Sequence, residues 1–196
     1  MGTMCIPMPV DKKAYLDDNY SSADGSHIVL KSSFVGSTYY AAVRVTRRGE
    51  SDGEPPVTFT LGAVVKTNSM QGEFCYKSMD ESMGPYESQC PIGILMLLTP
   101  TDELVRLSVF SETSRERASD WRERCRKHAE GKKRRARLKE GDRIKLPYKV
   151  RFVGGLEADT FTKVNLPRRR NVFRPEGNSS FVRLTSQHLD DAELLE

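Results

Sequence analysis

Alternating apolar and polar positions dominate the first part of the chain. Segments 27–35 and 38–45 are rich in β-branched and aromatic residues, and a Gly-Ser pair typical of a tight hairpin turn separates them. We expect a third strand over 57–66 and a short fourth around 74–76. Sequential strands with short loops predict an antiparallel meander, which needs an apolar cover on one face.

Helical spacing follows these strands. The apolar run 92–98 after Pro91 predicts a short helix, whereas 102–110 matches both helical and strand spacing. Thr113 and Glu116 have the spacing of a capping box at the start of a longer helix. Apolar residues then recur at steps of three and four, which predicts an amphipathic helix that ends near Gly131; its stripe is Ala118, Trp121, Cys125 and His128/Ala129.

Short alternating strands return after Leu138. Strands are expected over 143–153, 160–164 and 181–184, with glycine-rich turns typical of an SH3-like β-barrel or a compact β-meander. The predicted fold class is therefore α+β, an antiparallel sheet covered by helices and followed by this small β unit. The expected division is an α+β domain over 1–131, a basic connector over 132–140 and a small β domain over 141–196.

Composition narrows the function classes. No apolar run approaches the roughly 18 residues of a membrane span, and the N-terminus lacks the features of a secretory signal. We expect no membrane contact and a cytoplasmic location in a bacterial host cell. The four scattered cysteines are expected to be reduced there. No catalytic signature or cofactor motif is present, so we predict no catalytic residues, no cofactor and a non-enzymatic protein.

The net charge of +4 conceals an uneven distribution. Residues 115–139 hold twelve Lys/Arg and four Asp/Glu, a net +8 against −4 for the remainder. Basic clusters bind phosphates by releasing counterions, and nearby Phe161 and Phe173 offer stacking platforms. We therefore expect nucleic acid or a nucleoprotein complex as partner; the alternative is a solvated surface that the protein's own acidic residues neutralise. The candidate residues are Lys132, Lys133, Arg134, Arg135 and Arg137 on the connector and Arg168, Arg169 and Arg170 on a loop.

A zinc site and acid–base chemistry are two alternatives to a purely binding function. Cys90, Cys125 and His128, with Cys75, have the residue types of a zinc site, although an apolar helix stripe ordinarily buries such thiols. Paired carboxylates at Asp80 and Glu81, with Glu87, have the residue types for acid–base chemistry, although such residues more often cap turns. A metal-dependent enzyme is the third function hypothesis.

A signature lies after the fourth predicted strand. Residues 76–85 read Tyr-Lys-Ser-Met-Asp-Glu-Ser-Met-Gly-Pro, and Cys90-Pro91 and a Trp-Arg-Glu-Arg-Cys segment at 121–125 follow. This pattern resembles an uncharacterised bacterial family, found largely on plasmids and phages, with the signature Tyr-Lys-x-Met-Asp-Glu-Ser-Met-x-Pro. The resemblance covers residues 34–126 and implies a mobile-element setting without an established activity.

Accessory proteins of mobile elements frequently bind host or defence machinery, and this analogy supplies the alternative function. The chain would then be a protein inhibitor of a host or anti-phage defence complex that acts by protein–protein contact. The candidate partner-binding loop consists of Met79, Asp80, Glu81, Met83 and Tyr86.

Overall fold

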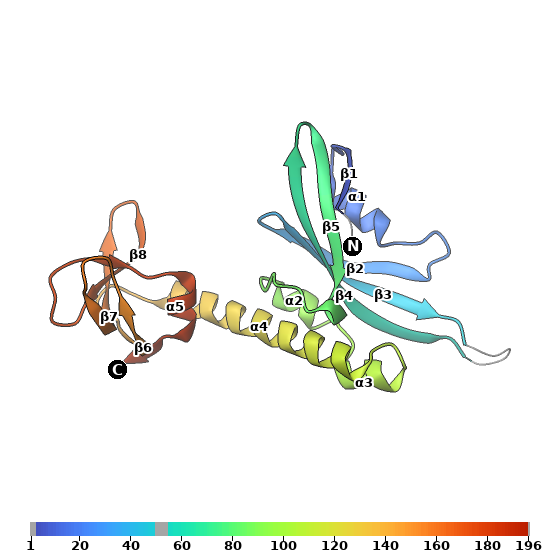
Figure 1. The fold of residues 1–196 in the computed structure, drawn as a ribbon. Helices are drawn as coiled ribbons and strands as arrows, with labels where there is room; N and C mark the ends of the chain where they lie inside the picture. The colour runs from blue at the N-terminus through green and yellow to red at the C-terminus, as the bar shows by residue number, and fades with distance from the viewer. Residues whose placement is uncertain (1–2, 50–54, 196) are drawn as a thin grey trace. The chain divides into compact units, whose positions relative to one another are not determined.

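Two antiparallel sheets of five strands each, with helices, form the part of the chain that the computed structural model describes, residues 3–49 and 55–195 (Figure 1). The α+β class is confirmed. The chain divides into a first unit, residues 1–126, and a second unit, residues 127–196, with the boundary inside helix α4, Glu112–Arg137. The strands are β1 Met4–Pro7, β2 His27–Val35, β3 Thr38–Arg47, β4 Val57–Met70, β5 Glu73–Asp80, β6 Arg143–Arg151, β7 Glu157–Leu166, β8 Arg169–Pro175, β9 Val182–Arg183 and β10 Glu193–Leu195.

The first sheet has the order β1-β5-β4-β3-β2, so its central part is the predicted meander. The β2–β3 hairpin pairs Val35 with Thr38 around a two-residue turn, as expected. In the β4–β5 hairpin Met70 pairs with Glu73, and positive φ angles at the two turn residues between them suit the strand twist. Strand β1 is outside the predicted set and pairs with β5 at the sheet edge.

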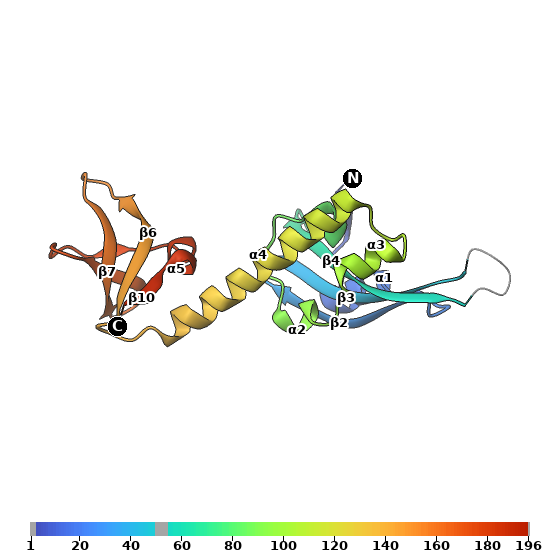
Figure 2. The same cartoon turned by 90° about the horizontal axis from the view of Figure 1, so that it is seen from below.

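Both faces of this sheet are covered. Along β3, Tyr39 and Ala41 pack with Leu16 of α1, while Tyr40 and Ala42 pack with α2 and with Trp121 of α4. Alternate residues of a strand point to opposite faces, and this explains the continuous apolar run at this point. Figure 2 shows α2 and α4 beside the strands of this unit. The helices are α1 Lys12–Asn19, η1 Glu81–Met83, α2 Ile92–Leu95, α3 Thr101–Arg106, α4 Glu112–Arg137 and α5 Ser186–Asp191.

Helix α4 differs from its prediction at both ends. Ser111 caps it, because its hydroxyl accepts a hydrogen bond from the Ser114 amide at 3.2 Å, so the expected capping role of Thr113 is wrong. The helix also continues through Gly131 to Arg137 instead of ending near the glycine. One interior glycine costs a helix only about 1 kcal/mol, and the lysines and arginines that follow are good helix formers. The basic run 132–137 is therefore helical.

No helix in the described ranges has the length and apolar character needed to cross a membrane.

The second sheet has the order β10-β6-β7-β8-β9 and forms a meander that is not a closed barrel within the described residues. Its core contains Ile144, Phe161, Phe173 and Leu189. Strand β8 is outside the predicted set: Arg168 lies in the β7–β8 turn, and Arg169 and Arg170 begin the strand. The expected loop at 168–170 is thus a tight turn followed by a strand.

A disulfide joins Cys5 to Cys75, so the expectation of four reduced cysteines is wrong. The two residues are register partners in β1 and β5, with a Cα–Cα distance of 4.1 Å. Strand pairing brings the thiols together across 70 residues of sequence, and spacing along the chain contains no sign of it. Cys90 and Cys125 are free and buried.

Thiol counting tests this pairing. In denaturant without a reductant, two cysteines should react with an alkylating agent, and four should react after reduction, as read by mass spectrometry. Replacement of both Cys5 and Cys75 by serine should lower the free energy of unfolding by about 2–4 kcal/mol, because the unfolded chain loses a long closed loop. Alkylation of all four cysteines without reductant would contradict the disulfide.

Candidate functional site

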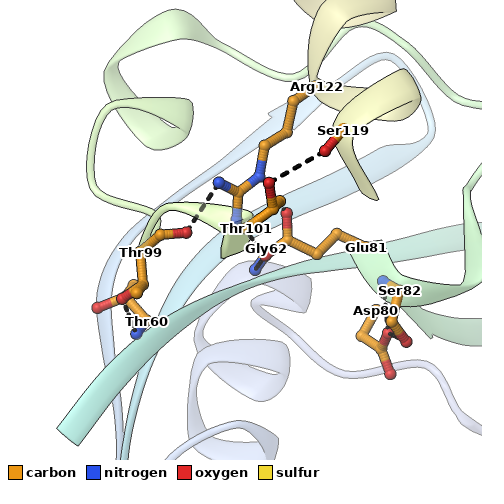
Figure 3. A network of polar contacts seen from close by, with 9 residues as sticks. All are labelled: Thr60, Gly62, Asp80, Glu81, Ser82, Thr99, Thr101, Ser119 and Arg122. Atoms are coloured by element: carbon orange, nitrogen blue, oxygen red, sulfur yellow. Dashed lines mark hydrogen bonds and ion pairs between the residues drawn. The ribbon is translucent and has the colours of Figure 1, made fainter. Parts of the chain in front are cut away.

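An ion pair between Glu81 and Arg122 lies inside the first unit. Glu81 is 0% exposed and Arg122 is 5% exposed. The guanidinium donates two hydrogen bonds to the carboxylate, from Nε to Oε2 at 2.6 Å and from Nη2 to Oε1 at 2.7 Å. Figure 3 shows this pair between the end of β5 and α4. Such a two-pronged contact satisfies both charges and fixes their relative orientation.

Further hydrogen bonds complete the network around the ion pair. The Gly62 amide donates to Glu81 at 3.0 Å, and Arg122 Nη1 donates to the Thr99 carbonyl at 2.8 Å. The Thr99 hydroxyl in turn accepts from the Thr60 amide at 2.8 Å. Burial raises the pKa of Glu81 above its ordinary value, against the opposing effects of Arg122 and the Gly62 amide. The network therefore joins four parts of the chain: β4, η1, α4 and the segment that precedes α3.

Helix α4 also holds the segment that follows the signature. The Trp121 indole donates to the Glu87 carbonyl at 2.8 Å, and Arg124 donates to the Pro85 carbonyl at 3.0 Å. A carbon atom placed on Gly62 would lie 3.2 Å from the Trp121 ring, so the glycine permits this close packing. The anchored segment nevertheless leaves the Tyr86 side chain 92% exposed.

The residues of the predicted partner-binding loop therefore have different environments. Glu81 is internal, and Asp80 caps η1 by accepting a hydrogen bond from the Ser82 amide at 2.8 Å. Met79 is half-buried at the end of β5, whereas Met83 and Tyr86 are exposed. The exposed surface of the loop thus consists of Asp80, Met83 and Tyr86, whereas Glu81 belongs to the interior of the fold.

The residues proposed for acid–base chemistry do not form a shared site. Glu81 is occupied by Arg122, Asp80 caps η1, and Glu87 pairs with Lys66 at 3.2 Å. Each carboxylate has a structural partner of its own.

The residues proposed for zinc binding have different structural roles. Cys75 is in the disulfide, and Cys90 and Cys125 lie in the apolar core, where burial raises the pKa of Cys125 to about 11. His128 belongs to the second unit, with its Nδ1 3.9 Å from the Asp190 carboxylate. Within the described residues, the one cluster with metal-ligand geometry is Cys5, Glu73 and Cys75, two of which form the disulfide.

The basic end of α4 contains arginines that contact α5 and other cations that do not pair within the second unit. Arg134 donates to the carbonyls of Asp190 and Ala192, and Arg135 pairs with the Asp190 carboxylate. A side chain on Gly131 would overlap Asp190, so the glycine makes room for α5. Three further cations of this segment are exposed and have no ion pair among the described residues; we call them the helix cluster, Lys132, Lys133 and Arg137.

A second basic feature surrounds a pocket of about 250 Å³ between β8 and β9. Val172, which is almost fully buried, forms its apolar floor and Phe181 lies at its side, whereas Val182, which also borders the pocket, packs against the core of the second unit. Three arginines line it, and we call them the pocket cluster: Arg168, Arg169 and Arg183. The side chain of Arg170, also a candidate, lies outside the described residues.

The expected stacking platforms are wrong, because Phe161 and Phe173 are both 0% exposed and belong to the core. Phe181 is the exposed aromatic residue of this region, at 49%. Phe181 and Arg183 were not among the predicted site residues. Their alternation with Val182 in a predicted strand is the signal that places both on one face.

Part of the chain matches a known family model. Residues 112–187 match the model of a family described as a domain of unknown function, DUF6927. The match spans α4 and strands β6 to β9 and lies after the signature at 76–85. No curated protein and no solved structure matches the chain.

The internal role of Glu81 is testable by substitution. Glu81→Gln should lower the free energy of unfolding by about 3–5 kcal/mol, because it leaves the buried Arg122 charge without its counterion. Urea unfolding followed by circular dichroism measures the change. Asp80→Asn is the matched control: it removes a neighbouring charge but retains a capping oxygen, so a loss below about 1 kcal/mol is expected. Equal effects of the two substitutions would contradict the assignment.

Proposed function

We propose that the protein is a non-enzymatic binding protein whose second unit engages nucleic acid or a nucleoprotein complex. The observation that carries this proposal is the presence of two basic clusters whose charges have no acidic partner among the described residues, the helix cluster and the pocket cluster. Unpaired cations on a surface are available to neutralise phosphates, and each contact releases counterions.

The distribution of charge between the units supports the same function. Residues 127–196 hold 17 basic and 10 acidic residues, a net +7, whereas residues 1–126 hold 14 basic and 17 acidic, a net −3. A positive potential over the second unit would attract a polyanion, and the first unit would not. The internal pairs of Arg134 and Arg135 reduce the set of candidate contacts but leave the two clusters intact.

The setting we propose, an accessory protein of a phage or plasmid in the bacterial cytoplasm, rests on the resemblance of residues 34–126. Residues 112–187, which match a family of unknown function, add no activity to it.

Tyr86 favours a second candidate function, inhibition of a host or defence complex by protein contact. The side chain is almost fully exposed although the neighbouring backbone is held by Arg124 and Trp121. Rigidly presented tyrosines are common anchors of protein interfaces, since little side-chain entropy is lost on binding. Nuclease treatment of a pull-down separates the two functions, because it should abolish association through nucleic acid and spare association through Tyr86.

Charge reversal tests the main proposal. Lys132→Glu with Lys133→Glu should weaken binding to labelled oligonucleotides by at least about tenfold at low salt and flatten the dependence of affinity on salt, measured by fluorescence anisotropy. The matched control is Arg44→Glu with Lys77→Glu, which reverses two exposed cations of the first unit and should leave affinity within about twofold. Absence of binding by the unmodified protein at low ionic strength would overturn the proposal.

A further inference from the structure

The pocket between β8 and β9 combines an apolar floor with a cationic rim. Val172 pairs with Arg183 and Phe173 pairs with Val182 in the β8–β9 register. Phe173 faces the core of the second unit, so the adjacent Val172 and its partner Arg183 lie on the other face of the sheet. Val172 is nevertheless only 4% exposed, and it lines the pocket together with Arg169 and Arg183.

Phe181 has a defined position at this pocket. It immediately precedes β9, a strand of two residues, and the Arg174 guanidinium lies 5.4 Å from the centre of its ring. A cation over one face of an aromatic ring restrains the ring. The exposed half of Phe181 therefore offers a flat apolar surface beside the pocket cluster.

Arg168 occupies a backbone position that favours glycine. It lies in the turn between Leu166 and Arg169 with a φ of 60°, in the left-handed region. A non-glycine residue in this region is strained unless the surroundings compensate, and such strain often accompanies a binding role. An arginine thus occupies a position where glycine would fit the backbone with less strain.

Together these features fit one ligand chemistry. A phosphate alone needs the arginines but not the apolar floor, and an apolar ligand needs the floor but not the arginines. A nucleotide unit of a single strand supplies a flat base for Phe181 and flanking phosphates for the rim. A duplex keeps its bases in the stack and supplies only phosphates.

We propose that this pocket binds an unpaired base and its adjacent phosphates in single-stranded nucleic acid. The inference rests on the proposed nucleic-acid function and narrows it to one site and one class of strand. RNA and DNA share the chemistry, so both are probed.

The experiment compares single strands and duplexes of the same sequence, as RNA and as DNA, by fluorescence anisotropy with the full chain. The unmodified protein should bind single strands at least about tenfold more tightly than duplexes. Phe181→Ala should remove about tenfold of the single-strand affinity and leave duplex affinity unchanged, since one stacked base is lost. Val153→Ala is the control, because it shortens an exposed apolar residue elsewhere in the second unit and should change neither affinity.

Two further variants separate binding from folding. Arg168→Gly should keep or raise the midpoint of thermal unfolding while weakening single-strand binding, a combination that a merely structural residue would not produce. Phe181→Trp adds a second indole to the buried Trp121, and its fluorescence should be quenched when a single strand binds.

The outcomes distinguish the two proposals. Equal affinity for single strands and duplexes, with no effect of Phe181→Ala but a loss in the helix-cluster variant, would overturn this inference and retain the proposed function. No binding to any oligonucleotide would overturn both. Higher affinity for RNA than for DNA, or the reverse, with the Phe181→Ala loss present, would support the inference and identify the strand.

Discussion

The buried contact between Glu81 and Arg122 imposes the strictest constraint on the first unit. Removing two ions from water is costly, and their attraction compensates only when the remaining donors and acceptors also find partners. Here those partners come from β4, through the Gly62 amide, and from the segment before α3, through the Thr99 carbonyl. Four parts of the chain that are distant in sequence must therefore be in place together. This requirement commits Glu81 of the signature to the interior, so the residues of this segment that are exposed to a partner are Asp80, Met83 and Tyr86.

The basic half of helix α4 also contains charges that have partners within the fold. Guanidinium groups carry several donors in a fixed fork, which suits them to carbonyl and carboxylate partners, whereas a lysine is a flexible point charge. Arg134 and Arg135 accordingly contact α5, while Lys132 and Lys133 face water. A count of basic residues along the run overstates the charge that is free for a ligand. The cations that remain free are Lys132, Lys133 and Arg137, which are exposed and have no ion pair among the described residues.

Local signals predicted a large part of the fold. The β2–β3 hairpin, the long β4 and the buried stripe of α4 all follow from periodicity and turn residues within one segment. The features that were not predicted depend on contacts between residues that are far apart in the sequence. Strand β1 and the Cys5–Cys75 disulfide exist because β5 pairs with the N-terminal segment, and Gly131 leaves the space that Asp190 occupies. The burial of Glu81 was not predicted for the same reason. Its neighbours in the sequence are polar, as in a solvated loop, and its partner Arg122 lies 41 residues further along the chain. The basic segments were found from composition, whereas the register of β8 and β9 was needed to place Phe181 and Arg183 beside Val172.

The two candidate surfaces belong to different units, and this affects how function can be separated. The exposed Tyr86 lies in the first unit, whose net charge is −3, and both basic clusters lie in the second, whose net charge is +7. A polyanion is repelled by the former charge and attracted by the latter, so electrostatics alone would direct nucleic acid to the second unit. The surface of Tyr86 would remain free for a protein, because an aromatic anchor depends on apolar burial and not on net charge. Nucleic-acid binding and protein contact are therefore compatible in one chain, and loss of one by substitution need not disturb the other.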